Sequence, residues 1–177
     1  MGKPHTNVDR ITVFSTTLGW IAAAWLDDGL CALTFGHAGH RRAIAALGLP
    51  EGSVEVCRLG ADSTDRFAGR IRAFGEGNPD DFLDVPVVLA GLTRFRQRVM
   101  RECRSIPYGG TITYGELAAM AGSPKAARAV GSVMAKNPIA LIIPCHRVVG
   151  AGGALGGYSA PTGIRMKKRL LRLEKTI

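Results

Sequence analysis

The chain has 177 residues, of which 46% are apolar and 21% are charged, proportions typical of a globular protein and not of a disordered or fibrous one. No stretch approaches the roughly 18 consecutive apolar residues of a membrane-spanning helix. Residues 1–5 also lack the apolar run of a signal peptide. We therefore expect a soluble, cytoplasmic protein with no membrane partner.

The charge is distributed unevenly along the chain. Residues 1–90 carry 8 basic and 11 acidic side chains, whereas residues 91–177 carry 15 basic and 3 acidic ones. Solubility alone does not require such segregation. We therefore expect a polyanion, and foremost nucleic acid, as the partner of the second half.

The cysteines form no C-x-x-C pair, so neither a zinc ribbon nor a thioredoxin-type motif is indicated. In a cytoplasmic protein we expect them to stay reduced. Four residues of the first half could form a scattered zinc site: His5, Cys31, His37 and His40. Their spacing matches no metal-binding pattern, and surface histidines with one buried thiol explain them more simply. No metal is expected.

The first half has the pattern of a small α/β domain. Runs of apolar and β-forming residues, separated by turn residues, predict a β-meander over residues 11–14, 20–25 and 30–35. The spacing of apolar residues predicts helices over residues 40–47 and 63–74. Residues 84–89 predict one more extended segment. Charge and pattern change after residue 90, which we take as the domain boundary.

The second half is predicted to be mostly helical. A first helix over residues 94–104 begins after Thr93 as a cap, and Thr113 with Glu116 forms a capping box for a short helix ending at residue 120. Ser123 as a cap and Pro124 as the first helical residue predict a further helix over residues 125–135.

The two short helices of this half predict a helix-turn-helix. The second helix carries Lys125 and Arg128, as a helix that contacts DNA would. Its other residues are mostly small, which suits a close approach in the minor groove better than base readout in the major groove. A purely structural helical hairpin is the alternative interpretation.

The chemical motif follows an apolar run over residues 139–143. Cys145 stands beside His146 and Arg147, and nearby positive charge predicts a lowered thiol pKa and a nucleophilic thiolate. The apolar run before it would also fit a buried structural cysteine, whereas the polar, glycine-rich sequence after it opposes that interpretation.

Several blocks of the second half match a known family in order and spacing: Pro-Cys-His-Arg-Val at 144–148, Ile-Pro-Tyr-Gly at 106–109, Thr-Tyr-Gly-Glu-Leu-Ala at 113–118, Ala-Arg-Ala-Val-Gly at 127–131, Asn-Pro at 137–138, Gly-Tyr-Ser at 157–159 and Lys-Arg-Leu-Leu at 168–171 with Glu174. Over residues 91–177 the chain resembles the O6-alkylguanine–DNA alkyltransferases, also called methylated-DNA–protein-cysteine methyltransferases. The first half resembles the family's N-terminal domain more weakly.

The resemblance implies that Cys145 is the alkyl acceptor. It implies that Glu174 orients His146, which deprotonates Cys145 through a water molecule. It further implies that Tyr114 donates a proton to the departing guanine and that Asn137 is a hinge between the recognition helix and the active-site loop. Without the resemblance, Glu174 would be an ordinary surface acid and Tyr114 an ordinary amphipathic aromatic residue.

The resemblance also implies that Arg128 fills the base stack after the target base has been flipped out, because a base inside a duplex cannot reach such a pocket. Otherwise Arg128 would be one more phosphate contact. The residues expected to contact DNA are Arg128, Lys125, Ser123, Ala127, Thr113 and Gly131. Those expected to line the alkylguanine pocket are Pro144, Val148, Tyr158, Ser159 and Met134.

The chemistry that the resemblance implies is stoichiometric. Transfer of an alkyl group to sulfur makes a thioether, which has no carbonyl for water to attack, so each molecule acts once. No cofactor is required. The expected partner is double-stranded DNA that contains O6-alkylguanine, with O4-alkylthymine as a further candidate lesion, and the protein is expected to act as a monomer.

The predicted architecture is α+β or α/β in two domains. Residues 1–90 form a structural, ribonuclease H-like α/β domain. Residues 91–177 form a mostly helical, winged-helix-like domain that binds DNA and transfers the alkyl group. The rival functions are a damage sensor without chemistry or a DNA-binding regulator, which the presence of Cys145 disfavours. A cysteine protease would need a distant histidine within its own motif.

Overall fold

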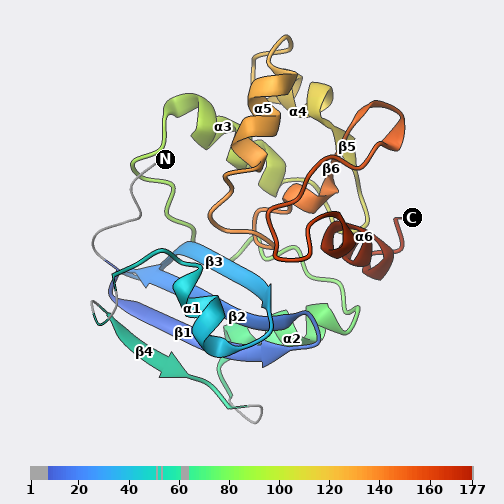
Figure 1. Cartoon of the computed structure of the whole chain (residues 1–177). Coiled ribbons are helices and arrows are strands. Elements are labelled where there is room, and N and C mark those ends of the chain that lie inside the picture. Colours follow the sequence, from blue (N-terminus) through green and yellow to red (C-terminus); the bar gives the residue numbers. More distant parts are fainter. Residues whose placement is uncertain (1–7, 51, 53, 61–63, 177) are drawn as a thin grey trace. The chain divides into compact units, whose positions relative to one another are not determined.

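The computed structural model of the chain describes residues 8–50, 52, 54–60 and 64–176 (Figure 1). The chain divides after residue 88 into two compact units, close to the change of composition after residue 90. We call residues up to 88 the first unit and residues from 89 the second unit. No helix within the described ranges combines the length and apolar character needed to cross a bilayer.

The first unit contains a four-stranded sheet in the order β3-β2-β1-β4. Three antiparallel strands form the predicted meander: β1 (Arg10–Thr16), β2 (Gly19–Leu26) and β3 (Gly29–His37). The short strand β4 (Glu55–Arg58) pairs in parallel with β1 at one edge. The turn from β1 to β2 requires Gly19, because its φ of +99° is unfavourable for a residue with a side chain.

Each face of this sheet packs against a different helix. Alternate residues of β1 and β2, including Ile11 and Val13, form one cluster with Ala43 of α1 (His40–Ala45). The opposite face places Phe14 against Phe67 of α2 (Arg66–Gly75), with the ring centroids 6.3 Å apart. The first unit is therefore a small sheet covered on both faces, a mixed α/β arrangement.

One prediction for the first unit needs correction, and a second is confirmed only in part. The second helix begins at Arg66, because the Asp65 side chain accepts from the Ala68 N–H and caps it there; residue 63 lies outside the described part. Residues 84–89 form no strand of their own. They make one parallel bridge between Val87 and Leu30.

The second unit consists mainly of short helices (Figure 1). Its described elements are α3 (Arg94–Arg104), β5 (Ile112–Thr113), α4 (Tyr114–Met120), α5 (Ala127–Met134), the 3-10 turn η1 (Cys145–Arg147), β6 (Val148–Val149), the 3-10 turn η2 (Ala151–Gly153) and α6 (Ile164–Leu173). The helix α3 contacts both α4 and α5. The predicted caps are confirmed: Thr93 caps α3, and Thr113 with Glu116 forms a capping box on α4.

The start of α5 differs from the prediction. Ser123 and Pro124 do not begin the helix; they belong to a turn that the Ala126 N–H closes on the Ser123 carbonyl oxygen at 2.9 Å. Proline at the second position of a turn satisfies the same backbone preference as proline at the start of a helix. The helix therefore starts at Ala127, and Lys125 lies in the turn before it.

Candidate active site

Cys145 begins the turn η1, at the end of the apolar run that the sequence predicted to be buried. Residues 139–143 are indeed buried, and the Cys145 N–H donates to the Ile143 carbonyl oxygen at 2.8 Å. Cys145 itself is 4% exposed. The residues that follow it form β6, which pairs in parallel with β5 through Ile112 and Val148. The loop is thus anchored to the strand that leads into α4.

Asn137 joins the end of α5 to this loop. Its side-chain Nδ2 donates to the Ile143 carbonyl oxygen at 2.8 Å, and its Oδ1 accepts from the Ile139 N–H at 3.0 Å. Asn137 also hydrogen-bonds to the Cys145 thiol, which acts to lower the pKa of that thiol. These contacts fit the hinge position that the family resemblance implies for Asn137.

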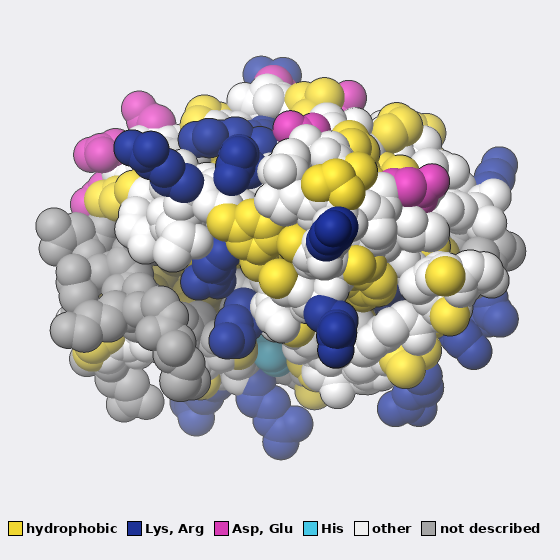
Figure 2. Space-filling model, turned by 90° about the horizontal axis from the view of Figure 1, so that it is seen from above, with side chains coloured by type: hydrophobic (Ala, Val, Ile, Leu, Met, Phe, Trp, Pro, Cys, Tyr) yellow, Lys and Arg dark blue, Asp and Glu magenta, His cyan; other side chains and the backbone are white. Residues whose placement is uncertain are grey.

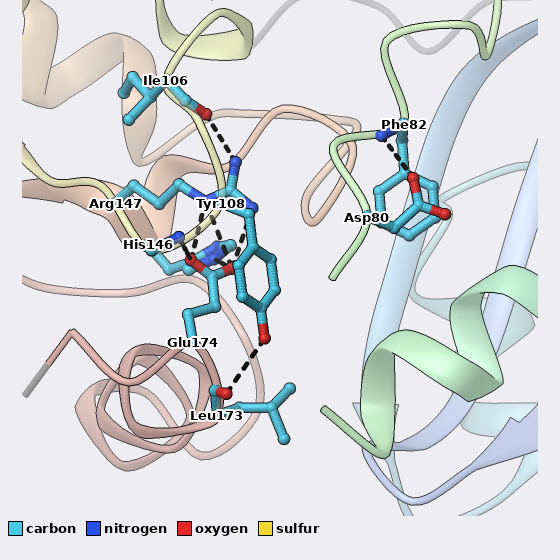
Figure 3. Close-up of polar contacts among 9 residues, drawn as sticks. Asp80, Phe82, Ile106, Tyr108, His146, Arg147, Leu173 and Glu174 are labelled. Carbon is cyan, nitrogen blue, oxygen red and sulfur yellow. Dashed lines mark hydrogen bonds and ion pairs between the residues drawn. The ribbon is translucent and has the colours of Figure 1, made fainter. Parts of the chain in front are cut away.

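Glu174 lies at the centre of a buried group of charges (Figure 3). Its carboxylate accepts from His146 Nε2 at 2.8 Å and from Arg147 Nε and Nη2, each at 3.0 Å. The Gly109 N–H donates to it at 3.2 Å, and Arg147 also donates to the Ile106 carbonyl oxygen at 2.6 Å. Four donors from two loops therefore fix one carboxylate in place.

The bond between Glu174 and His146 determines the form of the imidazole. Burial acts to raise the pKa of Glu174, but hydrogen bonds from His146 and Arg147 outweigh it and bring the pKa to about 2. Burial lowers the pKa of His146. An ionised carboxylate only accepts, so a neutral His146 must carry its proton on Nε2. Its buried Nδ1 has no hydrogen-bond partner in the described part of the chain and is left as a proton acceptor.

The expected lowering of the Cys145 pKa is wrong. Burial raises the pKa of this thiol, although Asn137, the charge of Lys167 and Tyr158 act in the opposite direction. The two basic neighbours in sequence do not supply the positive charge expected of them, because burial lowers the pKa of His146 and Arg147 is paired with Glu174. The thiol is therefore held protonated until a base removes its proton.

Lys167 of α6 is a residue of this site that the sequence analysis missed. Its side chain is fully buried, and its Nζ donates to the Val148 carbonyl oxygen at 2.6 Å. The same ammonium lies 5.8 Å from the centre of the Tyr114 ring. Burial lowers the pKa of Lys167, whereas the charge of Cys145 raises it. It is thus a cation placed near the sulfur.

A cavity of about 180 Å³ opens beside Cys145. Of the predicted pocket residues, Met134, Tyr158 and Ser159 line it, and so does Tyr114. Pro144 and Val148 do not line it. The remaining lining residues, which the sequence analysis did not name, are Ala135 and Gly157.

Tyr114 begins α4 and reaches into the cavity from one side. A Cβ atom at position 156 would lie 2.8 Å from its hydroxyl oxygen, so Gly156 leaves the room that this hydroxyl occupies. Burial raises the pKa of Tyr114, which keeps the phenol protonated and able to donate a hydrogen bond at neutral pH.

The predicted DNA-contacting residues lie on or next to the α4–α5 hairpin, which is at the top of Figure 1 and therefore on the side seen in Figure 2. Arg128 on α5 and Lys125 in the preceding turn are exposed. Ala127 and Gly131 lie on α5. Thr113 caps the start of α4, and Ser123 begins the turn before α5. Lys and Arg side chains lie among apolar ones on this face (Figure 2).

Within the described ranges, no three His, Cys, Asp or Glu side chains gather as a metal site would require. Of the conceivable zinc ligands, His5 lies outside these ranges. Cys31 is buried in β3, and its thiol donates to the Ala24 carbonyl oxygen at 3.2 Å.

Comparisons with known proteins place these features in context. A family model described as "6-O-methylguanine DNA methyltransferase, DNA binding domain" matches residues 94–176. A protein of Mycobacterium tuberculosis named methylated-DNA–protein-cysteine methyltransferase is 43% identical over 155 residues, which are 85% of this chain and 90% of the relative. A protein of Methanosarcina acetivorans with the same name is 37% identical over 166 residues, which are 92% and 96% of the two chains.

Solved structures show the same similarity. The crystal structure of the Mycobacterium tuberculosis OGT in complex with DNA matches with a TM-score of 0.74 and 32% identity, over 94% of this chain and 93% of that chain. The crystal structure of the Mycobacterium tuberculosis O6-methylguanine methyltransferase matches with a TM-score of 0.73 and 33% identity over the same shares. The similarity therefore extends over both units.

Proposed function

The chain belongs to the methylated-DNA–protein-cysteine methyltransferase family, and from this premise we propose that Cys145 is the cysteine that accepts the alkyl group. The protein is a DNA-binding methyltransferase that repairs alkylated DNA by moving the alkyl group onto a cysteine. The observation that carries the assignment is the position of Cys145 in the wall of the 180 Å³ cavity, one residue from the His146–Glu174 pair.

The other cysteines lack this setting. Cys31 is buried in the sheet of the first unit, and Cys57 is exposed on β4. Cys103 is buried in α3, and burial raises the pKa of its thiol well above the usual range. A thiol without a neighbouring base remains a poor nucleophile.

The proposed reaction begins with loss of the Cys145 proton. This proton passes through a bridging water to His146 Nδ1. The Glu174 carboxylate stabilises the imidazolium that forms. The Lys167 ammonium stabilises the thiolate. The sulfur then attacks the alkyl carbon, the bond between that carbon and guanine O6 breaks, and its electron pair remains on the guanine. Tyr114 donates a proton to the departing base.

The product limits each molecule to one reaction. The new bond is a thioether, and water has no carbonyl to attack, so the cysteine is not regenerated. We propose that O6-alkylguanine, with O4-alkylthymine as a second lesion, is taken up in the cavity after the base is flipped out of the duplex. Flipping is needed because Cys145 lies in a buried wall that a stacked base could not reach.

The second unit would supply both DNA binding and chemistry, and the first unit would be structural. We propose a winged-helix-like arrangement for the second unit, supported by its helical hairpin and the β5–β6 pair. A ribonuclease H-like arrangement of the first unit is supported by the meander with a parallel fourth strand. A cytoplasmic protein with access to DNA fits this activity.

The central test is the identity of the modified residue. Duplex DNA with labelled O6-methylguanine is incubated with the protein, and peptide mass mapping locates the methyl group. We expect one equivalent, on Cys145. Cys145→Ala should accept none while still binding DNA, and Cys57→Ala, an exposed cysteine of the first unit, should behave as wild type. A methyl group on Cys31, Cys57 or Cys103 would refute the proposal.

We propose in addition that Arg128 fills the gap that the flipped base leaves. Arg128→Ala should then slow the single-turnover reaction on duplex DNA at saturating protein by roughly 5- to 150-fold, the effect of losing about 1–3 kcal/mol of stacking. The reaction with the free alkylated base should not change. An exposed arginine of the first unit, Arg42, provides the control. A normal saturated rate would show that Arg128 only contacts phosphate.

A further inference from the structure

The helix α6 has two faces of opposite character. Met166, Lys167, Leu170 and Leu171 are buried, and Glu174 follows them on the same side. On the exposed face, every side chain is basic except that of Ile164 at the start of the helix. We call this set the α6 basic face: Arg165, Lys168, Arg169, Arg172 and Lys175.

The sequence of α6 and the residues after it supplies no exposed acidic side chain to offset the charge of this face. The single acid in residues 164–177 is Glu174, which is buried and bonded to His146 and Arg147. In the described part of the chain, no carboxylate forms an ion pair with the exposed Arg165, Lys168, Arg172 or Lys175. A face that only serves solubility usually mixes both signs.

The arrangement works against the helix itself. Arg165 and Lys168, and Lys168 and Arg172, are three and four residues apart, so these like charges are neighbours and repel one another. Arg165 also lies in the first turn, where the helix dipole disfavours a cation, and no acidic residue is present there. A bound polyanion would remove this repulsion.

The α6 basic face lies apart from the proposed lesion-binding surface. Figure 1 shows α6 at the opposite end of the second unit from the α4–α5 hairpin. The helix packs on the turn η1, whereas α4 and α5 pack on each other and on α3. DNA seated on the hairpin would therefore leave α6 uncovered.

We propose that the α6 basic face binds the phosphate backbone of a second duplex segment while the α4–α5 hairpin holds the first. The recognition is electrostatic and independent of sequence, because exposed Lys and Arg on a helix match regularly spaced phosphates. Such a protein can pass directly from one DNA segment to another. This inference rests on DNA being the partner and not on which cysteine reacts.

The test is a bridging assay with two undamaged duplexes. One duplex is fixed to beads, the full-length protein is added, and a second, fluorescent duplex is offered at low salt. The wild-type protein should retain the fluorescent duplex. Lys168→Gln/Arg172→Gln should retain at least about fivefold less, because two phosphate contacts are lost, and the salt dependence of retention should become shallower by about 2 in log–log slope.

The control removes the same charge elsewhere. Arg41→Gln/Arg42→Gln changes two exposed arginines of α1 in the first unit and should retain the second duplex as the wild type does. Methyl transfer at saturating protein should be normal in both variants. Absence of bridging by the wild type, or equal bridging by Lys168→Gln/Arg172→Gln, would overturn the proposal. An equal loss in the control would show an effect of net charge alone and would overturn it as well.

A second variant separates lost binding from lost folding. Lys168→Glu places a carboxylate between Arg165 and Arg172, where it replaces repulsion by attraction. We expect its melting temperature to rise while its bridging falls further than that of Lys168→Gln/Arg172→Gln. A melting temperature that falls together with bridging would contradict the proposed origin of the effect.

Discussion

Each unit contains an arginine whose guanidinium donates several hydrogen bonds to carboxylate groups. The two ion-pair clusters differ in their exposure to water. In the first unit, Arg70 donates to Asp80 and Asp84 over distances of 2.7–2.8 Å. Its side chain is 23% exposed, and that of Asp84 is 57% exposed. In the second unit, Arg147 is 2% exposed and Glu174 is fully buried.

The difference shows what a buried charge is kept for. An exposed ion pair exchanges water contacts for protein contacts and adds little stability. A buried pair costs desolvation that its attraction does not always recover, so apolar residues could serve stability equally well. The Arg147–Glu174 pair is therefore best explained by chemistry: Arg147 holds Glu174 ionised, and Glu174 fixes the tautomer of His146.

The largest expected effect follows from removing the buried carboxylate. Glu174→Gln leaves Arg147 buried without its counter-charge and should lower the free energy of unfolding by about 3–5 kcal/mol. It should also nearly abolish methyl transfer, because His146 loses the negative charge that stabilises its imidazolium. Urea unfolding and single-turnover rates measure the two effects.

Adding Arg147→Met to that variant separates them. The double variant no longer buries a lone cation and should recover part of the stability, while transfer should stay slow. Recovery of the rate together with the stability would contradict the catalytic explanation of the buried pair.

A smaller effect is expected at Lys167. Lys167→Met removes the ammonium near Cys145, so the pKa of the thiol should rise further and transfer at pH 7 should slow by roughly 10-fold, the scale of one lost charge-assisted contact. The rate should recover as the pH increases. The adjacent, exposed Lys168→Met is the control, and an unshifted pH–rate profile for Lys167→Met would refute the role.

Stability should depend on pH mainly through the buried cluster. The Glu174 pKa is about 2 in the folded protein against 4.5 ordinarily, so its stabilisation is complete above about pH 4.5 and is lost as the pH falls toward 2. His146 acts in the same direction below pH 6.5, because burial lowers its pKa and the unfolded chain binds the proton more readily. Urea midpoints between pH 7 and pH 3 should fall less steeply in Arg147→Met/Glu174→Gln than in the wild type; parallel curves would contradict this.

The smallest effect is expected at the exposed ion-pair cluster of Arg70 with Asp80 and Asp84. Arg70→Met should shift the urea midpoint by no more than roughly a few tenths molar, because water already screens this cluster. Transfer should be unchanged. A loss of stability as large as that of Glu174→Gln would show that exposure to water does not distinguish the Arg70 cluster from the Arg147–Glu174 pair.

Local patterns in the sequence were sufficient to predict much of this structure. Thr113 and Glu116 predicted a helix start because both partners of the capping box lie within one turn. The start of α5 could not be predicted with the same certainty, since Ser123 followed by Pro124 suits a turn as well as a helix.

The electrostatics of the site depend on contacts distant in sequence. The pKa of Cys145 could not be predicted from its neighbours, because Arg147 pairs with a carboxylate 27 residues away. Lys167 was missed because it belongs to a run of basic residues, and only the packing of α6 shows which of them is buried.

The bond from Lys167 to Val148 also bears on how members of such a family can diverge. It ties α6 to β6, so the two ends of the intervening segment, residues 150–163, are fixed independently of its length. Gly157, Tyr158 and Ser159, which border the cavity, lie within that segment. The length of this segment can therefore change, and with it the shape of the cavity, without displacing the nucleophile.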